Sequence, residues 1–372
     1  MRILVAGDWH SDLHEQAVAD ALEALGHEVT RFAWHHYFGP PRSARGAAIG
    51  RDRPRTATLL QRLQNRYLSG PLVGRLNRDL LALAASTRPE LVLVYRGTHV
   101  RPGTLCALAR MHPRPVLLGY NNDDPFGPGQ PRSMWRHFLA SLPHYDAVLA
   151  YRHRNLDEYR AAGARRVRLL RSWFIPARNH PVSLDAADHE RYDCDVVFIG
   201  HHEDDGRAAS LAAAAEAGFR LRLFGHGYEW DPVLARHPAL SALAPVRQAW
   251  GEEYNKALCG AKIALCFLSR LNRDTYTRRC FEIPATGTLM LSERTADLES
   301  MFRPGVEADY FDDPASLLAQ LRRYLDDDAL RTRVAAAGRA RVVADGHDVA
   351  SRMRDLLDWV ETWRSSVTGA IP

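Results

Sequence analysis

A helix-to-strand junction in the second half of the chain reads Arg278-Arg279-Cys280-Phe281-Glu282-Ile283-Pro284-Ala285-Thr286-Gly287-Thr288-Leu289-Met290-Leu291. Pro284 suits the first turn of a short helix, and Gly287 stands where that helix would stop before the apolar strand 288–291. A helix N-terminus beside two arginines is a favourable anion site, and the Glu282 carboxylate can accept hydrogen bonds from sugar hydroxyls. The junction therefore predicts a site for a sugar joined to a diphosphate, with a solvated charged turn as the alternative.

Length and composition indicate a globular protein of two domains. A chain of 372 residues is too long for one ordinary core. Of its 49 basic residues only Lys256 and Lys262 are lysines, so the net charge of +5 reflects an arginine bias spread over the whole chain. Aromatic residues are not interleaved with the basic ones, and we therefore expect no nucleic-acid partner.

The cysteines and the apolar runs favour a cytoplasmic location. The five cysteines form no C-x-x-C pair, and their odd number and apolar surroundings predict reduced core thiols. The N-terminal apolar run is too short for a signal peptide, and no stretch approaches the ~20 apolar residues of a membrane span.

The first domain is predicted over residues 1–175 from repeated strand–helix alternation. The apolar strand 2–6 is followed by a loop that carries Asp8 and His10, a helix over about 13–25, and a further strand. This order is typical of a doubly wound domain, whose ligands bind beyond the C-terminal ends of the strands. Asp8 and His10 lie at such an end, although each could instead cap the helix or bind water. The loop lacks G-x-G-x-x-G, so nothing predicts a dinucleotide.

Two further features of the first domain have open interpretations. Asp123 and Asp124 follow the strand 116–120, where they could orient an acceptor hydroxyl, act as a base, or cap the turn before Pro125. The Gly-, Pro- and Arg-rich segment 39–58 could contact an acidic acceptor, a lipid surface or a partner, or remain a solvated loop. Peripheral membrane contact is therefore one of the expectations.

The polar segment 176–192 is predicted to be a linker, because it shows no periodicity. We expect a second doubly wound domain over 193–346, followed by a C-terminal helix and tail over 347–372 that could pack back on the first domain.

In the second domain a buried strand ends in Gly200, and the next strand closes on Gly225. Gly200 and Arg207 occupy the place where a nucleotide diphosphate meets the first turn of a doubly wound domain. The neighbouring histidines at 201, 202 and 226 could suggest a metal. However, adjacent histidines rarely point at one ion and the chain has no H-E-x-x-H, so no metal site is predicted.

Residues 272–287 resemble the R-x-F-E-x-P-A-x-G signature of CgeB-like glycosyltransferases, carried here by Arg279, Phe281, Glu282, Pro284, Ala285 and Gly287. Further blocks similar to that family are Asp123-Asp124-Pro125-Phe126, Phe198-Ile199-Gly200 with Arg207, Ser292-Glu293, residues 302–307 and His347. The resemblance spans nearly the whole chain and is strongest over 255–355.

The resemblance implies a GT-B fold, an α/β architecture of two facing Rossmann-like doubly wound domains. It implies that the C-terminal domain binds a nucleotide-sugar donor and the N-terminal domain the acceptor, without a bound metal or other cofactor. Arg279 would contact the diphosphate, Glu282 the ribose or sugar hydroxyls, and Gly200 and Arg207 would border the phosphates. Arg278, Gly225 and Gly287 complete the predicted donor-binding set.

One departure from related enzymes leaves the stereochemistry open. The E-x7-E pair of many retaining relatives is incomplete, because Asp274 lies eight residues before Glu282 and Thr275 seven before it. If the enzyme inverts the anomeric centre, the candidate bases are His10, Asp8, Asp123 and Asp124.

The sequence thus predicts a glycosyltransferase that moves a sugar from a nucleotide-sugar donor to a hydroxyl of a glycan, protein, lipid or small molecule. One alternative is a sugar-nucleotide epimerase or hydrolase on the same fold. The other is a non-catalytic sugar-binding or scaffold protein of an envelope or coat assembly.

Overall fold

The computed structural model describes residues 1–38 and 58–368. The five arginines of the segment 39–58, for which a contact with an acceptor, a lipid surface or a partner was one expectation, lie outside the described residues. The chain divides into two compact units. Unit 1 comprises Met1–Arg171 with Val349–Pro372, and unit 2 comprises Ser172–Asp348. The chain enters and leaves unit 2 through neighbouring segments, since the backbone N–H of Phe174 donates to the carbonyl of His347 at 3.1 Å.

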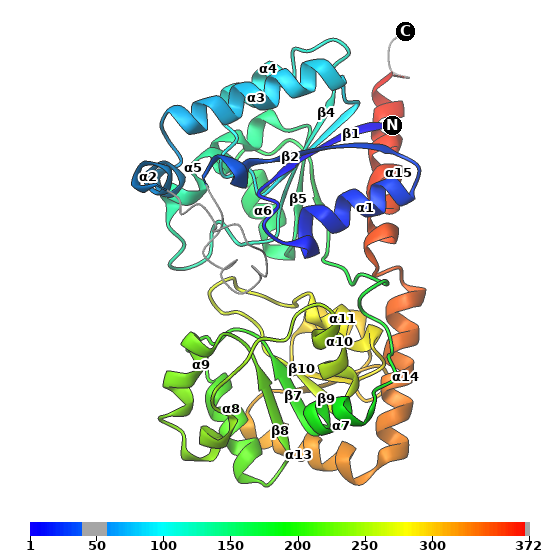
Figure 1. Cartoon of the computed structure of the whole chain (residues 1–372). Helices are drawn as coiled ribbons and strands as arrows, with labels where there is room; N and C mark the ends of the chain where they lie inside the picture. The colour runs from blue at the N-terminus through cyan, green and yellow to red at the C-terminus, as the bar shows by residue number, and fades with distance from the viewer. Residues whose placement is uncertain (39–57, 369–372) are drawn as a thin grey trace. The chain divides into compact units, whose positions relative to one another are not determined.

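Unit 1 is built on a six-stranded parallel sheet with the order β2-β1-β3-β4-β5-β6 (Figure 1). Its central strands are continuous apolar runs with both faces covered, as a parallel sheet requires. The strands are β1 (Arg2–Gly7), β2 (Glu28–Ala33), β3 (Leu91–Tyr95), β4 (Val116–Asn121), β5 (Ala147–Ala150) and β6 (Val167–Leu169).

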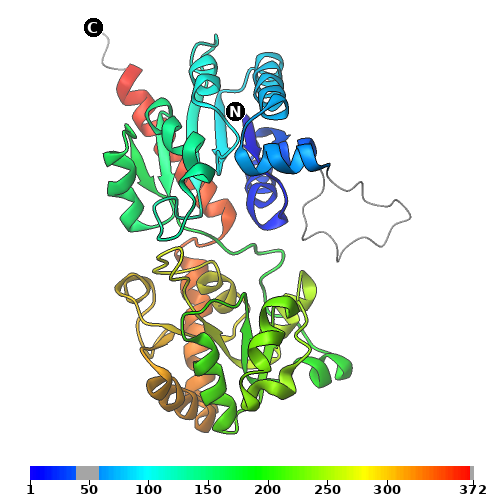
Figure 2. The ribbon, with the colours of Figure 1, turned by 90° about the vertical axis from the view of Figure 1, so that its left-hand side faces the viewer.

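Helices lie on both sides of this sheet (Figure 2). Leu76, Leu80, Trp135 and Phe138 from two of them pack in the apolar core of the unit. The helical segments are η1 (Asp12–Gln16), α1 (Ala17–Ala24), η2 (Trp34–Tyr37), α2 (Leu59–Tyr67), α3 (Pro71–Thr87), α4 (Pro102–Leu108), α5 (Arg132–Ser141), η4 (Leu142–His144), α6 (His153–Ala161) and α15 (Val349–Thr368).

Unit 2 has a five-stranded parallel sheet with the order β11-β10-β9-β7-β8 and a core of its own. Its strands are β7 (Cys194–Ile199), β8 (Leu221–Phe224), β9 (Ala261–Cys266), β10 (Leu289–Glu293) and β11 (Asp309–Phe311). Its helical segments are α7 (Ala186–Tyr192), α8 (Arg207–Glu216), α9 (Gly227–Leu234), η5 (Pro238–Leu243), α10 (Glu252–Cys259), α11 (Arg279–Ala285), α12 (Ala296–Met301), α13 (Pro314–Asp326) and α14 (Asp328–Ala344).

The junction 278–291 forms a helix followed by a strand, with one difference from the prediction. Helix α11 begins at Arg279, so Pro284 lies near its end and not in its first turn. A seven-residue helix tolerates this position, because the missing proline N–H removes only one hydrogen bond close to the terminus. Gly287 stops the helix as expected: its φ is +81° and its N–H donates to the carbonyl of Pro284 at 2.9 Å.

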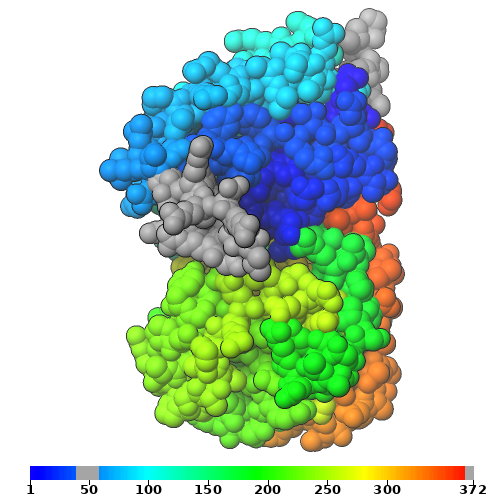
Figure 3. Space-filling view, in the orientation of Figure 1, coloured from blue at the N-terminus to red at the C-terminus, as the bar shows by residue number. Residues whose placement is uncertain are grey.

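The predicted linker is not free of regular structure. Helix α7 occupies its last residues, and Asp185 and Asp188 form a capping box at the start of that helix. The periodicity rule missed α7 because a seven-residue helix spans barely two turns. After unit 2 the chain returns to unit 1, where α15 packs against α1 (Figures 1 and 3).

No helix in the described part of the chain is both long enough and apolar enough to cross a bilayer.

Candidate active site

The two sheets share a strand order that defines where ligands bind. In each unit the first strand lies between the second and the third, as β1 lies between β2 and β3, and β7 between β8 and β9. The first connection therefore runs to one side of this strand, and the second connection crosses over to its other side. Doubly wound sheets bind ligands at this switch point, at the carboxyl ends of the strands. Both candidate clusters of charged residues lie at such an edge.

In unit 1 an Asp–His pair follows strand β1. Nδ1 of His10 lies 2.8 Å from a carboxylate oxygen of Asp8, and both side chains are about one-third exposed. The Asp8 carboxylate accepts this hydrogen bond and raises the pKa of His10. Burial acts to raise the pKa of Asp8, but the hydrogen bond from His10 and the charges of His10 and Arg96 together lower it. The arrangement leaves Nε2 of His10 as the basic atom, and no group in the described residues hydrogen-bonds to it.

A buried carboxylate that sequence reasoning missed holds the Asp8 loop in place. Glu15 accepts a hydrogen bond from the backbone N–H of Asp8 at 2.9 Å, and burial raises the pKa of its carboxyl group. Gly7 makes room for it, because a Cβ at that position would lie 2.4 Å from Oε1 of Glu15. The signal available in the sequence was Gly7 itself, the glycine directly before the charged loop.

Arg96 is a second residue that sequence reasoning missed. It follows strand β3 and forms an ion pair of 2.6 Å with Asp123, which follows β4. Its guanidinium carbon also lies 5.7 Å from the centre of the Trp135 ring. The backbone of Arg96 adopts φ +69°, a conformation that is costly for a residue with a side chain and is common at functional sites. The structure thus places Asp123 at the same edge as Asp8 and His10.

Asp124 has a different environment from the other three candidate bases. Its side chain is fully buried, and Oδ1 accepts hydrogen bonds from the backbone N–H of Phe126 and from Nδ2 of Asn155, both at 3.0 Å. This is the turn-capping role that was the alternative for Asp124 in the sequence. Its geometry favours support of the loop over contact with a substrate.

In unit 2 an arginine without a carboxylate partner lies at the carboxyl edge of the sheet. A Cβ built on Gly200, at the end of β7, would lie 3.0 Å from Nη2 of Arg279, so the guanidinium packs directly on this glycine. Among the described residues no carboxylate forms an ion pair with Arg279. Burial acts to lower its pKa, but the nearby Tyr254 and the Glu282 carboxylate raise it. A guanidinium is always charged and offers five N–H donors. Arg279 is therefore available to an anionic ligand.

Glu282 lies one helical turn after Arg279 on the same face of α11. Its side chain is buried, and Oε2 accepts a hydrogen bond of 2.7 Å from the hydroxyl of Tyr254 on α10. Burial, together with the charge of Glu282, raises the pKa of Tyr254 well above its usual range. The second oxygen of Glu282 remains as an acceptor for a ligand hydroxyl. Arg278, the residue before Arg279, occupies the N-cap position of α11, but its side chain makes no capping hydrogen bond.

Arg207 is already engaged within the loop that precedes α8. Its guanidinium donates to both carboxylate oxygens of Asp205 and to the carbonyl of His201, and its side chain is 5% exposed. Contact with a phosphate would require this buried ion pair to open. The geometry favours a positioning role, in which Arg207 fixes the loop between β7 and α8.

Gly225 and Gly287 lie at opposite edges of the unit 2 sheet. A Cβ on Gly225 would lie 2.4 Å from the carbonyl oxygen of Gly200, so this glycine lets the end of β8 approach the end of β7. Gly287 precedes β10 and lines a cavity of about 630 Å³ at the amino edge, together with Arg220 and Lys262. This position corrects the prediction that Gly287 borders the donor: it stops α11 far from the strand ends that carry Gly200.

Comparisons with known proteins bear on the fold and on one region of the chain. Residues 207–358 match a protein-family model described as glycosyl transferase-like, and this region includes the whole 278–291 junction. No curated protein matches the chain by sequence.

Solved structures match over nearly the whole chain at low identity. Sucrose-phosphate synthase (tll1590) from Thermosynechococcus elongatus has a TM-score of 0.68 at 14% identity, covering 98% of this chain and 100% of that one. Anabaena Alr3699/HepE, solved in complex with UDP, has a TM-score of 0.65 at 13% identity, covering 97% and 100%. A putative UDP-N-acetylglucosamine 2-epimerase from Listeria monocytogenes has a TM-score of 0.59 at 12% identity, covering 98% and 96%.

These likenesses define the fold. The chain has two Rossmann-like α/β units with parallel sheets, the architecture of GT-B glycosyltransferases, and its second unit carries a glycosyl transferase-like region.

Proposed function

We propose that this protein is a glycosyltransferase that transfers a sugar from a nucleoside diphosphate sugar to an acceptor hydroxyl, with unit 2 binding the donor and unit 1 the acceptor. The observation that carries the proposal is the charged guanidinium of Arg279, which packs on Gly200 and forms no ion pair among the described residues, at the switch point of a sheet in a glycosyl transferase-like region. The neighbour HepE is solved with UDP-glucose, which supports a donor of this class.

The donor contacts follow from the chemistry of the side chains. A diphosphate needs a cation at its leaving oxygen, and Arg279 provides bidentate, charge-assisted hydrogen bonds there. Glu282 accepts a hydrogen bond from a ribose or sugar hydroxyl. Gly200 keeps the backbone close to the phosphates because it has no side chain.

The base is His10. In an inverting transfer its Nε2 takes the proton of the acceptor hydroxyl while that oxygen bonds to the anomeric carbon. The bond from this carbon to the diphosphate breaks at the same time, and the diphosphate leaves with the bonding electrons. Asp8 stabilises the imidazolium that forms, and the raised pKa of His10 strengthens the base. An inverted anomeric configuration in the product is the corresponding expectation.

Transfer requires neither a metal nor another cofactor in this proposal, because Arg279 offsets the charge on the leaving group. Turnover should therefore persist in EDTA. From the CgeB-like signature we further propose that the chain belongs to that family. We also place the reaction in the cytoplasm, where nucleotide sugars are made and where the five free thiols stay reduced.

A thermal-shift screen of nucleotides and nucleotide sugars tests the donor assignment. A ligand present at 100 times its dissociation constant stabilises the folded protein by about 2.7 kcal/mol, which shifts the melting temperature measurably. The expected result is stabilisation by one nucleoside diphosphate and by its sugar. No shift with any of them contradicts the proposal and favours the scaffold alternative.

The epimerase or hydrolase alternative shares this fold, since one neighbour is a putative 2-epimerase. Acceptor dependence distinguishes the two. A transferase releases the nucleoside diphosphate only when an acceptor hydroxyl is supplied, whereas a hydrolase releases it in water alone and an epimerase changes the sugar without release.

A further inference from the structure

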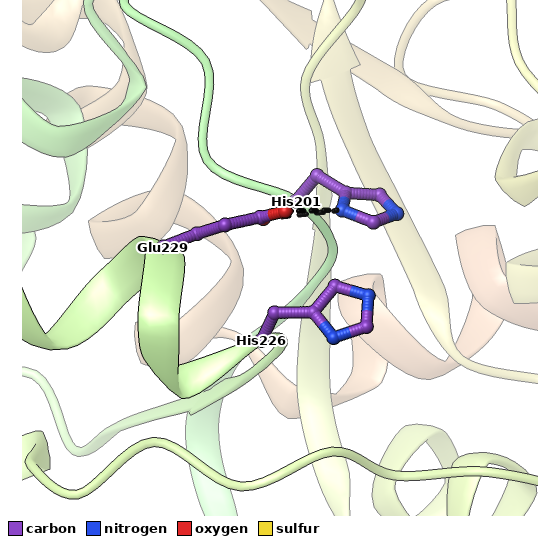
Figure 4. Close-up of side chains that lie close together, drawn as sticks. All are labelled: His201, His226 and Glu229. Carbon is purple, nitrogen blue, oxygen red and sulfur yellow. Dashed lines mark hydrogen bonds and ion pairs between the residues drawn. The ribbon is translucent and has the colours of Figure 1, made fainter. Parts of the chain in front are cut away.

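Three potential metal ligands from separate segments converge at the carboxyl edge of the unit 2 sheet. They are His201 after β7, His226 after β8, and Glu229 in the first turn of α9 (Figure 4). Taking one ligand atom from each residue, all of these atoms lie within 4.8 Å of one another. In Figure 4 the Glu229 side chain reaches toward His201, and the His226 ring lies beside this pair.

Glycines bring the three segments together. A side chain on Gly225 would collide with the Gly200 carbonyl that precedes His201, and one on Gly227 would lie 2.9 Å from the carbonyl of Val246. Both glycines flank His226, so its backbone can lie close to β7. Nε1 of Trp230 donates to the Gly200 carbonyl at 2.9 Å, which ties helix α9 to the same point.

We propose that His201, His226 and Glu229 bind one divalent transition-metal ion of the Zn²⁺ type. Two imidazole nitrogens and one carboxylate oxygen form a donor set that suits Zn²⁺ and leaves a position for water, whereas Ca²⁺ and Mg²⁺ prefer oxygen ligands throughout.

The distances are compatible with one ion after a small adjustment. Ligand atoms ~2.1 Å from a tetrahedral ion lie about 3.4 Å apart. Nδ1 of His201 and Oε2 of Glu229 are already 3.1 Å apart. The exposed side chain of His201 can rotate to close the remaining separations.

Neighbouring groups orient these ligands as outer-shell partners do in metal sites. The backbone N–H of His202 donates to Oε2 of Glu229 at 3.2 Å, and Gln248 contacts Nδ1 of His226. A simple ion pair between His201 and Glu229 does not need His226, yet the two imidazole rings have centroids only 4.8 Å apart. An ion at this site links the loop after β7 to α9, and this link does not depend on the proposed transfer reaction.

Calorimetric titration of the chelator-treated, tag-free chain with ZnCl₂ tests the proposal. We expect one ion per chain. Loss of an outer-shell partner weakens metal binding 10–100-fold. Loss of a direct ligand should weaken it more, so we expect His226→Ala and Glu229→Gln each to reduce Zn²⁺ affinity by more than about 100-fold. Glu229→Gln keeps the size of the side chain, so it tests the site even if the His226→Ala variant misfolds. The Co²⁺-loaded protein should show the visible absorption of a tetrahedral site.

His189→Ala is the matched control, because His189 also pairs with a carboxylate, that of Asp193 at 2.9 Å, but has no third ligand. It should leave Zn²⁺ affinity unchanged. Any of three results would overturn the proposal. The wild type and Glu229→Gln could bind Zn²⁺ with equal affinity, Glu229→Gln and the control could lose affinity equally, or the wild type could bind no Zn²⁺.

Discussion

Replacement of Arg279 by alanine should weaken donor binding strongly without unfolding the protein. The guanidinium packs on Gly200, and although the Glu282 charge acts on it, it forms no ion pair among the described residues, so its charge is mainly available to a ligand. A hydrogen bond to a charged group contributes ~1.5–3 kcal/mol, so the dissociation constant of the nucleoside diphosphate should rise about 10- to 150-fold. The loss in kcat/KM should be larger still, because negative charge develops on the leaving group in the transition state.

The assay is calorimetric titration of the nucleoside diphosphate, followed by initial rates with saturating acceptor. Arg220→Ala is the charge-matched control. Arg220 directly precedes β8 at the amino edge of the unit 2 sheet, forms an ion pair with Asp195, and has a side chain that is 63% exposed. It should change donor affinity less than threefold, since exposed ion pairs contribute about 0–1 kcal/mol. The reasoning fails if Arg279→Ala binds the donor as tightly as Arg220→Ala while both variants melt at the wild-type temperature.

Three further substitutions test neighbouring parts of the site. Gly200→Ala inserts a methyl group against the Phe198 ring and the Arg279 guanidinium. It should weaken donor binding about tenfold while costing ~1–3 kcal/mol of stability, measured by titration and denaturant unfolding. Asp8→Asn removes the carboxylate that raises the pKa of His10, so the acidic limb of the kcat/KM profile should move to lower pH and the plateau should fall. Asp205→Asn removes the closer of the two carboxylates beside the buried Arg207, with Glu203 remaining at 3.8 Å, and should lower the free energy of unfolding by ~1–3 kcal/mol.

Controls for these variants are available in the same chain. Gly103→Ala adds a methyl group with no heavy atom within 4 Å and should leave donor binding unchanged. Asp157→Asn removes an exposed ion pair with Arg160 and should change stability by less than about 1 kcal/mol. An acidic limb that stays in place in Asp8→Asn would rule out the Asp8–His10 pair as the titrating base.

The sequence predicted the parallel sheets and the residues at their carboxyl edges well, because those features depend on local patterns. Continuous apolar runs such as those of β1 and β7 indicate buried parallel strands, and the residues that follow them must lie at the carboxyl edge. Asp8, His10 and Gly200 could therefore be located from the chain alone. Gly287 stops the helix as predicted but lies at the amino edge. Helix α11 connects two parallel strands, β9 and β10, so it runs back from the carboxyl edge to the start of β10.

Pairing between distant segments could not be predicted in this way. The ion pair between Arg96 and Asp123 depends on β3 and β4 being neighbours with a particular register. The approach of His201 to His226 depends on the missing side chain of Gly225, and no periodicity reports that contact.

The side-by-side passage of the chain into and out of unit 2 has a consequence for biosynthesis. Unit 1 needs helix α15, which the ribosome makes last, whereas unit 2 is continuous from Ser172 to Asp348. Domains generally fold as units during synthesis, so unit 2 can fold while α1 still lacks its cover. A chain that stops at residue 348 would then carry a finished unit 2 and a unit 1 with an uncovered apolar surface, which quality-control proteases would recognise.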